Sequence, residues 1–122
     1  MPIRFYILQL LFVCYLVLVI ILSLQPAESA LNLGIFDKLI HFMVYFLMAI
    51  LALVAFRSKG GRAAALLVTF SLGAILELGQ GLVIDRNPSY ADAVANILGA
   101  LSGVLTYRIW LRDKVSVGYP PE

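Results

Sequence analysis

The feature that most constrains this chain is a run of twenty residues, 5–24, without a single charged side chain. An α-helix rises about 1.5 Å per residue, so such a run covers the roughly 30 Å hydrocarbon core of a bilayer. Three further long apolar runs follow, and turns rich in charge, glycine and proline separate them. The pattern predicts an all-α polytopic membrane protein, a bundle of four transmembrane helices at about 5–24, 38–56, 63–84 and 90–111.

Composition excludes the main alternatives to this class. Of the 122 residues, 62% are hydrophobic and 13% are charged, whereas soluble domains have about 45–50% apolar residues and about 25% charged ones. A chain this short cannot bury so much apolar surface in a water-soluble fold. The net charge of +2 and the lack of a long basic run also argue against nucleic-acid binding. We therefore expect a single membrane domain over residues 1–122.

The basic residues predict how the bundle is oriented. If the first helix begins inside the cell, two basic residues, Lys38 and Arg86, fall on the outer side. The other seven fall on the inner side: Arg4, Arg57, Lys59, Arg62, Arg108, Arg112 and Lys114. Loops that face the cytoplasm carry an excess of lysine and arginine. The distribution therefore predicts that both termini are cytoplasmic.

Polar residues interrupt three of the apolar runs at matching depths. They lie near the beginning of the second and fourth predicted helices and near the end of the third, so all fall in the outer layer of the membrane. Spacings of i, i+3 and i, i+4 place the members of each set on one helix face. Such groups are costly in lipid and usually face a partner, a cavity or a functional site. We expect one outward-facing polar pocket, built from Asp37, Lys38, His41, Tyr45, Glu77, Gln80, Arg86, Ser89, Asp92 and Asn96.

Glycines accompany two of these polar stripes. Gly99 continues the stripe of the fourth helix and forms a G-x-x-x-G pair with Gly103, a spacing that lets two helices approach closely. Gly73 and Gly81 flank Glu77 on the third helix and could serve the same purpose.

Each polar residue also has a purely structural interpretation, since hydrogen bonds between helices fix the register of a bundle. For Tyr45 or Asn96 alone we favour that interpretation slightly over ligand contact. For the set as a whole we favour function, because a glutamate about 10 Å deep, Glu77, has no evident stabilising role. Lys38 and Arg86 could neutralise these acids, receive an anionic head group, or extend to the interface. No cofactor or metal is predicted, because one histidine makes a poor site for zinc.

The same residues carry a resemblance to a known family. Four motifs occur in order over residues 20–103: Ser-Leu-Gln-Pro at 23–26, Asp-Lys-x-x-His-x-x-x-Tyr-Phe at 37–46, Glu-x-x-Gln at 77–80, and Arg-x-x-Ser-x-x-Asp-x-x-x-Asn-x-x-Gly at 86–99. This series resembles the VanZ-like membrane proteins. The resemblance implies a multi-pass protein of the bacterial inner membrane. It also implies a link to teicoplanin resistance, with which the founding member is associated.

Three functions remain open at this stage. The first is a non-enzymatic envelope protein whose pocket binds a lipid head group or a lipid-linked wall precursor. The second is an intramembrane hydrolase or transferase with His41, Glu77 and Asp92 as candidate catalytic groups and Ser89 or water as nucleophile. The third is a small transporter or a subunit of a larger complex, formed by a homo-oligomer or with another membrane protein. The sequence favours the first, because it contains no known catalytic motif and the inner halves of the helices lack polar residues.

Overall fold

The computed structural model describes residues 3–25, 35–83 and 88–116. Within these ranges four long helices follow one another, α1 (Ile3–Ser23), α2 (Ile35–Ala55), α3 (Lys59–Gln80) and α4 (Tyr90–Thr106). Helix α4 continues without a break through a π-helical turn, η2 (Tyr107–Leu111), into α5 (Arg112–Ser116). The four helices, the last counted over Tyr90–Ser116, are long and apolar enough to cross a membrane. The predicted all-α, four-span class is confirmed.

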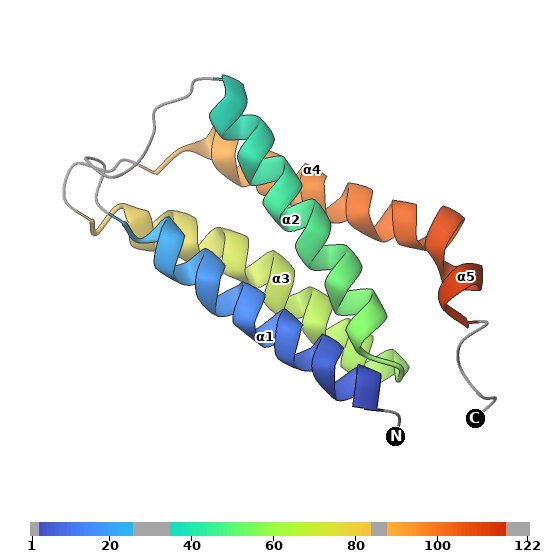
Figure 1. Cartoon of the computed structure of the whole chain (residues 1–122). Helices are drawn as coiled ribbons and strands as arrows, with labels where there is room; N and C mark the ends of the chain where they lie inside the picture. The colour runs from blue at the N-terminus through green and yellow to red at the C-terminus, as the bar shows by residue number, and fades with distance from the viewer. Residues whose placement is uncertain (1–2, 26–34, 84–87, 117–122) are drawn as a thin grey trace.

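Successive helices run in alternating directions (Figure 1). The ends of α1 and α3 and the beginnings of α2 and α4 therefore lie at the same end of the molecule, which we call the polar end. The beginnings of α1 and α3, the end of α2 and helix α5 lie at the opposite end, which we call the basic end. This arrangement brings the polar side chains of α2, α3 and α4 to one end of the bundle.

Helices α2 and α4 make the most extensive contact between helices in the described residues. Glycines on α4 allow it, as the G-x-x-x-G spacing predicted. A Cβ atom at Gly99 would overlap the backbone carbonyl group of Phe42, and one at Gly103 would lie 2.5 Å from the carbonyl oxygen of Phe46. Gly73 on α3 likewise lies against Tyr45, since a Cβ atom there would be 3.2 Å from the ring. The lack of a side chain at these positions is what lets the helices approach.

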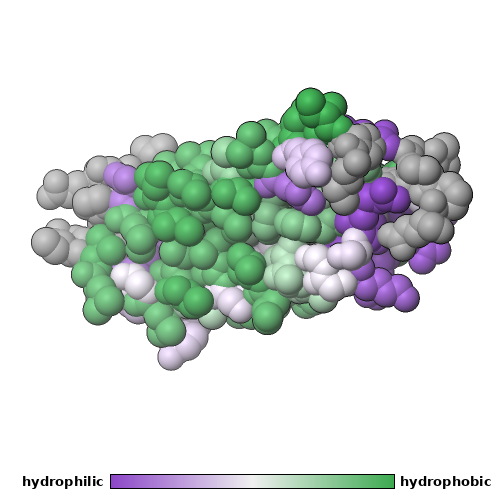
Figure 2. Space-filling model, turned by 90° about the horizontal axis from the view of Figure 1, so that it is seen from below, coloured by the Kyte–Doolittle hydropathy of each residue, from purple (hydrophilic) through white to green (hydrophobic). Residues whose placement is uncertain are grey.

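The apolar side chains divide between a small core and a large outer surface. The buried core contains Phe12, Val19, Met48, Ala52, Ala55, Ala65 and Leu76. Many other large apolar residues face outwards on the four long helices; Leu10 on α1 and Ile75 on α3 are both 62% exposed. Figure 2 shows the resulting apolar band across the middle of the molecule, with hydrophilic residues concentrated towards one end. Such a band is the surface that lipid tails would cover.

Four helix boundaries differ by three residues or more from those predicted. Helix α3 begins at Lys59 rather than at residue 63, because the Ser58 side chain accepts a hydrogen bond from the amide of Gly61 (2.9 Å) and caps the helix. The stretch 57–62, predicted as a turn, is therefore partly helical. The same helix ends at Gln80 instead of residue 84, beside two glycines of low helix propensity. Helix α2 begins three residues earlier than predicted, and the fourth helix continues beyond 111 to Ser116.

Candidate functional site

The first part of the site lies on the first two turns of α2. Asp37 and His41 are one helical turn apart, so their side chains lie on the same face. The His41 Nε2 atom is 3.9 Å from the Asp37 Oδ1 atom. Lys38 extends to the same face, and its Nζ atom donates a hydrogen bond to Asp37 Oδ2 at 3.2 Å. Three ionisable groups thus meet at the beginning of one helix.

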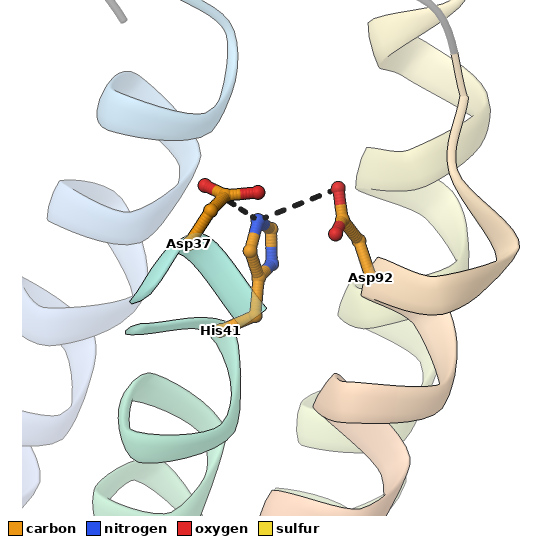
Figure 3. Close-up of side chains that lie close together, drawn as sticks. All are labelled: Asp37, His41 and Asp92. Atoms are coloured by element: carbon orange, nitrogen blue, oxygen red, sulfur yellow. Dashed lines mark ion pairs between the residues drawn. The ribbon is translucent and has the colours of Figure 1, made fainter. Parts of the chain in front are cut away.

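Helix α4 supplies the opposite wall of this site. Lys38 Nζ forms an ion pair with Asp92 Oδ1, and His41 Nε2 lies 3.7 Å from Asp92 Oδ2. The other ring nitrogen, His41 Nδ1, is 3.0 Å from the side-chain oxygen of Asn96. We call these five residues, Asp37, Lys38, His41, Asp92 and Asn96, the polar cluster. Figure 3 shows its centre, where the His41 ring of α2 lies between a carboxylate of its own helix and one of α4.

The beginning of α4 is fixed by local hydrogen bonds. Ser89 is its N-cap residue, and the Ser89 hydroxyl oxygen accepts a hydrogen bond from the amide of Asp92 at 3.3 Å. The cap places Asp92 in the first turn, where a carboxylate is stabilised by the helix dipole. Ser89 therefore positions Asp92, and its contact with a ligand stays a prediction.

Glu77 and Gln80 of α3 form a separate group. The Glu77 Oε1 atom accepts a hydrogen bond from the backbone amide of Ser89. The Gln80 side chain donates a hydrogen bond to the backbone carbonyl oxygen of Ser23 at 3.1 Å. Both side chains are buried, at 8% and 5% exposure. Glu77 thus connects α3 to the beginning of α4, and Gln80 connects α3 to the end of α1, which gives both residues the stabilising role that the sequence did not reveal.

A small cavity adjoins the polar cluster, towards the middle of the helices. It has a volume of about 50 Å³ and lies between α2, α3 and α4. Tyr45, Phe70, Gly73, Ala74, Ala93, Asn96 and Ile97 line it. Ala74 and Ile97 are exposed, so the cavity opens towards the lipid-facing surface between α3 and α4. Asn96 belongs to both the cavity and the cluster, and it joins an apolar recess to a charged one.

The structure therefore brings five of the ten predicted site residues into one cluster and places Tyr45 in the adjoining cavity. Glu77 and Ser89 support the cluster through hydrogen bonds at the start of α4, whereas Gln80 connects α3 to the end of α1. The remaining residue, Arg86, lies outside the described residues. The partners that sequence reasoning missed are backbone groups, such as the carbonyl of Ser23, whose position no residue type indicates.

The charge of the cluster decides what it can bind. Two carboxylates face one ammonium group, so with a neutral His41 the cluster carries a net charge of −1. Access is from the side of α2, because the side chains of Asp37 and Lys38 are about a third exposed (35% and 34%), whereas that of Asp92 is only 12% exposed. The cluster can therefore offer an ammonium donor, carboxylate acceptors and an imidazole to a ligand at the membrane interface.

Four apolar helices with a charged cluster near one end define a polytopic membrane protein. The chain belongs to the VanZ/LLP1 family, whose model matches residues 5–111, and this confirms the resemblance seen in the sequence motifs. No curated protein and no solved structure gives a significant match to the chain.

Proposed function

We propose that this VanZ/LLP1 protein is a non-enzymatic protein of the bacterial inner membrane. In this proposal the polar cluster faces outwards and binds the head group of a lipid or of a lipid-linked wall precursor. By holding such a molecule at the outer surface, the protein would affect the susceptibility of the cell to teicoplanin. Lys38 is the residue that we expect to meet the phosphate of the head group, and Arg86, which lies outside the described residues, is a second candidate from the sequence.

The observation that carries this proposal is the place of Lys38. Its ammonium group pairs with two carboxylates of the cluster, and yet the Lys38 side chain is about a third exposed. An ammonium is a compact donor that binds phosphate well. The neighbouring Asp37, Asp92 and Asn96 offer oxygen atoms that can accept hydrogen bonds from hydroxyl or amino groups of the same head group.

The adjoining cavity supports a lipid rather than a soluble ligand. It opens between Ala74 and Ile97, on the apolar surface that an acyl chain would contact. A molecule with its phosphate at Lys38 could place the first methylene groups of a chain beside this recess, since Asn96 lines both. The predicted orientation, with seven basic residues inside, puts this end in the outer leaflet, where lipid-linked wall precursors are used.

Native mass spectrometry of the purified protein tests the proposal. We expect an anionic lipid to remain bound to the unaltered chain, to be lost in Lys38→Ala, and to be kept in Lys38→Arg, which preserves the positive charge. Lys59→Ala is the matched control, because Lys59 is an exposed lysine at the opposite end of the bundle. The same variants are then compared for teicoplanin susceptibility in cells. An unaltered protein that retains no lipid would contradict the proposal.

An intramembrane hydrolase or transferase is the alternative, and one observation favours it. His41 lies near two carboxylates, as a general base often does. The candidate nucleophile Ser89, however, uses its hydroxyl oxygen to cap α4, and within the described residues it makes no hydrogen bond with His41. A His41→Ala variant that keeps the full envelope phenotype would exclude catalysis by this group.

A further inference from the structure

One nitrogen and two carboxylates converge on a single point between α2 and α4. The His41 Nε2 atom faces Asp37 Oδ1 at 3.9 Å and Asp92 Oδ2 at 3.7 Å. One ligand atom from each of the three residues lies within 4.8 Å of the others. Figure 3 shows that the imidazole nitrogen points into the space between the two carboxylates.

The second ring nitrogen sets the orientation of the His41 ring and the tautomer of its neutral form. Its Nδ1 atom lies 3.0 Å from the side-chain oxygen of Asn96. An amide oxygen can only accept a hydrogen bond, so Nδ1 carries the hydrogen in this pair. In the neutral ring the lone pair of Nε2 is then directed at two carboxylates, an arrangement that a positive charge between these atoms, either a proton on Nε2 or a metal ion, would stabilise. Metal-binding histidines are oriented in this way, with the other ring N–H bonded to an oxygen acceptor.

Lys38 does not use the carboxylate oxygens that face His41. Its ammonium pairs with Asp37 Oδ2 and with Asp92 Oδ1. The atoms nearest to Nε2 are the other two, Asp37 Oδ1 and Asp92 Oδ2. One oxygen of each carboxylate therefore remains available for a second cation, while Lys38 holds both side chains through their other oxygens.

We propose that Asp37, His41 and Asp92 bind a divalent transition-metal ion of the Zn²⁺ or Mn²⁺ kind. Bonds of about 2.0–2.2 Å to nitrogen and oxygen require ligand atoms roughly 3.0–3.5 Å apart. The present separations of 3.7 and 3.9 Å exceed this by a few tenths of an ångström. A small rotation of Asp37, whose side chain is 35% exposed, would shorten its distance to His41, and the Asp92 side chain would have to move by a few tenths of an ångström as well. One imidazole with two carboxylates suits both ions.

The sequence predicted no metal because the chain has only one histidine, and the geometry of this site answers that objection. A single histidine is a poor zinc site alone, but here one carboxylate comes from the same helix face and another from α4, which follows much later in the chain. Three protein ligands leave coordination positions for water or for an oxyanion. Because the cluster has a net charge of −1, a divalent ion would change it to +1. The ion would then help to bind a phosphate head group, an extension that rests on the proposed function, whereas the metal site itself does not.

Metal binding is tested on the full chain in detergent, after treatment with a chelator. Mn²⁺ is titrated and the bound ion is counted by electron paramagnetic resonance, with Zn²⁺ added as competitor. We expect one ion per chain, displaced by Zn²⁺, with a nitrogen coupling in the spectrum that disappears in His41→Gln. Asp37→Asn and Asp92→Asn should each weaken the affinity at least tenfold. Asp113→Asn, which changes an exposed acid at the basic end, should leave it unchanged.

Circular dichroism of each variant shows whether it is folded. Asp92 is less exposed than Asp37, so if Asp92→Asn does not fold, Asp37→Asn still tests the metal site. The inference is overturned if the unaltered chain binds neither ion, or if folded Asp37→Asn binds Mn²⁺ as tightly as the unaltered chain. Lipid retention is measured separately. If lipid is retained but no metal binds, only the metal site is contradicted. If metal binds but no lipid is retained, only the proposed function is contradicted.

Discussion

At the scale of single residues, the two buried acids near the polar end are stabilised in different ways. Asp92 lies opposite the ammonium of Lys38, and Glu77 accepts the backbone amide of Ser89. An uncompensated carboxylate inside a span is costly, so each acid needs such a partner. The partner of Asp92 is an accessible cation, which a ligand can share. The partner of Glu77 is a backbone group at a helix start, which points to a role in stability.

Substitution of Glu77 separates these two roles. We expect Glu77→Leu to lower the free energy of unfolding by about 1–3 kcal/mol, because the amide of Ser89 loses its acceptor. Glu77→Gln keeps a side-chain oxygen in the same place and should cost clearly less. Thermal unfolding in detergent micelles measures both effects. If Glu77→Gln is as stable as the unaltered chain but retains no lipid, Glu77 contacts the ligand and the structural assignment is wrong.

The sequence predicted which residues gather at the polar end. It did not predict that they divide into the polar cluster and the separate group of Glu77 and Gln80. Helical spacing brought Asp37 and His41 to one face, and matching depth joined them to Asp92 and Asn96. Depth along a helix does not give rotation about its axis, however. The sequence could therefore not show that Glu77 faces the start of α4 rather than the imidazole. Rotation is set by packing against neighbouring helices, which no single-helix pattern contains.

At the scale of helices, the contact between α2 and α4 controls the geometry of the cluster, because each helix supplies one wall of it. Gly99 is the residue on which this contact depends most. A methyl group there would meet the backbone of Phe42, with a carbon–carbon separation of 2.9 Å to the carbonyl carbon. Backbone atoms cannot rotate away as a side chain can, so relief requires the two helices to separate.

Gly99→Ala is therefore expected to destabilise the protein by about 1–3 kcal/mol or more, in the range of overpacked cores. It should also weaken ligand retention, because separating α2 from α4 breaks the pairing of Lys38 with Asp92. Gly60→Ala is the matched control, since a Cβ atom at Gly60 meets nothing within 4 Å. In a helix that control should be neutral or stabilising by up to about 1 kcal/mol. Equal melting temperatures for the two variants would show that the close approach is not required.

The apolar runs predicted the four long helices correctly, but they did not predict where each helix begins and ends. The stretch 57–62 has charges and two glycines, which favour a turn. The cap provided by Ser58 and the cation–π contact of Arg62 with the Tyr107 ring, at 5.5 Å, outweigh that preference and start α3 early. The second of these is a contact between distant parts of the chain. Local composition cannot reveal it.

At the scale of the whole molecule, the alternating helix directions separate two kinds of charge. The polar end collects Asp37, Lys38, His41 and Asp92 in mutual contact. The basic end carries most of the lysine and arginine residues of the chain, and an apolar band lies between the ends (Figures 1 and 2). Since cytoplasmic loops favour basic residues, this distribution predicts a fixed orientation in the membrane. The proposed function depends on it, because wall precursors are accessible from the outer side.

Cysteine labelling decides the orientation. Cys14, the single cysteine, lies on the exposed face of α1 and is replaced by alanine. New cysteines are then placed at Ile35, an exposed residue that begins α2 at the polar end, and at Lys59, an exposed residue that begins α3 at the basic end. A membrane-impermeant maleimide should label Ile35→Cys in intact cells, and Lys59→Cys only after permeabilisation. Labelling of both variants in permeabilised cells shows that each thiol is reactive. The reverse pattern in intact cells would place the polar cluster on the cytoplasmic side, and binding of an external wall precursor would then be excluded.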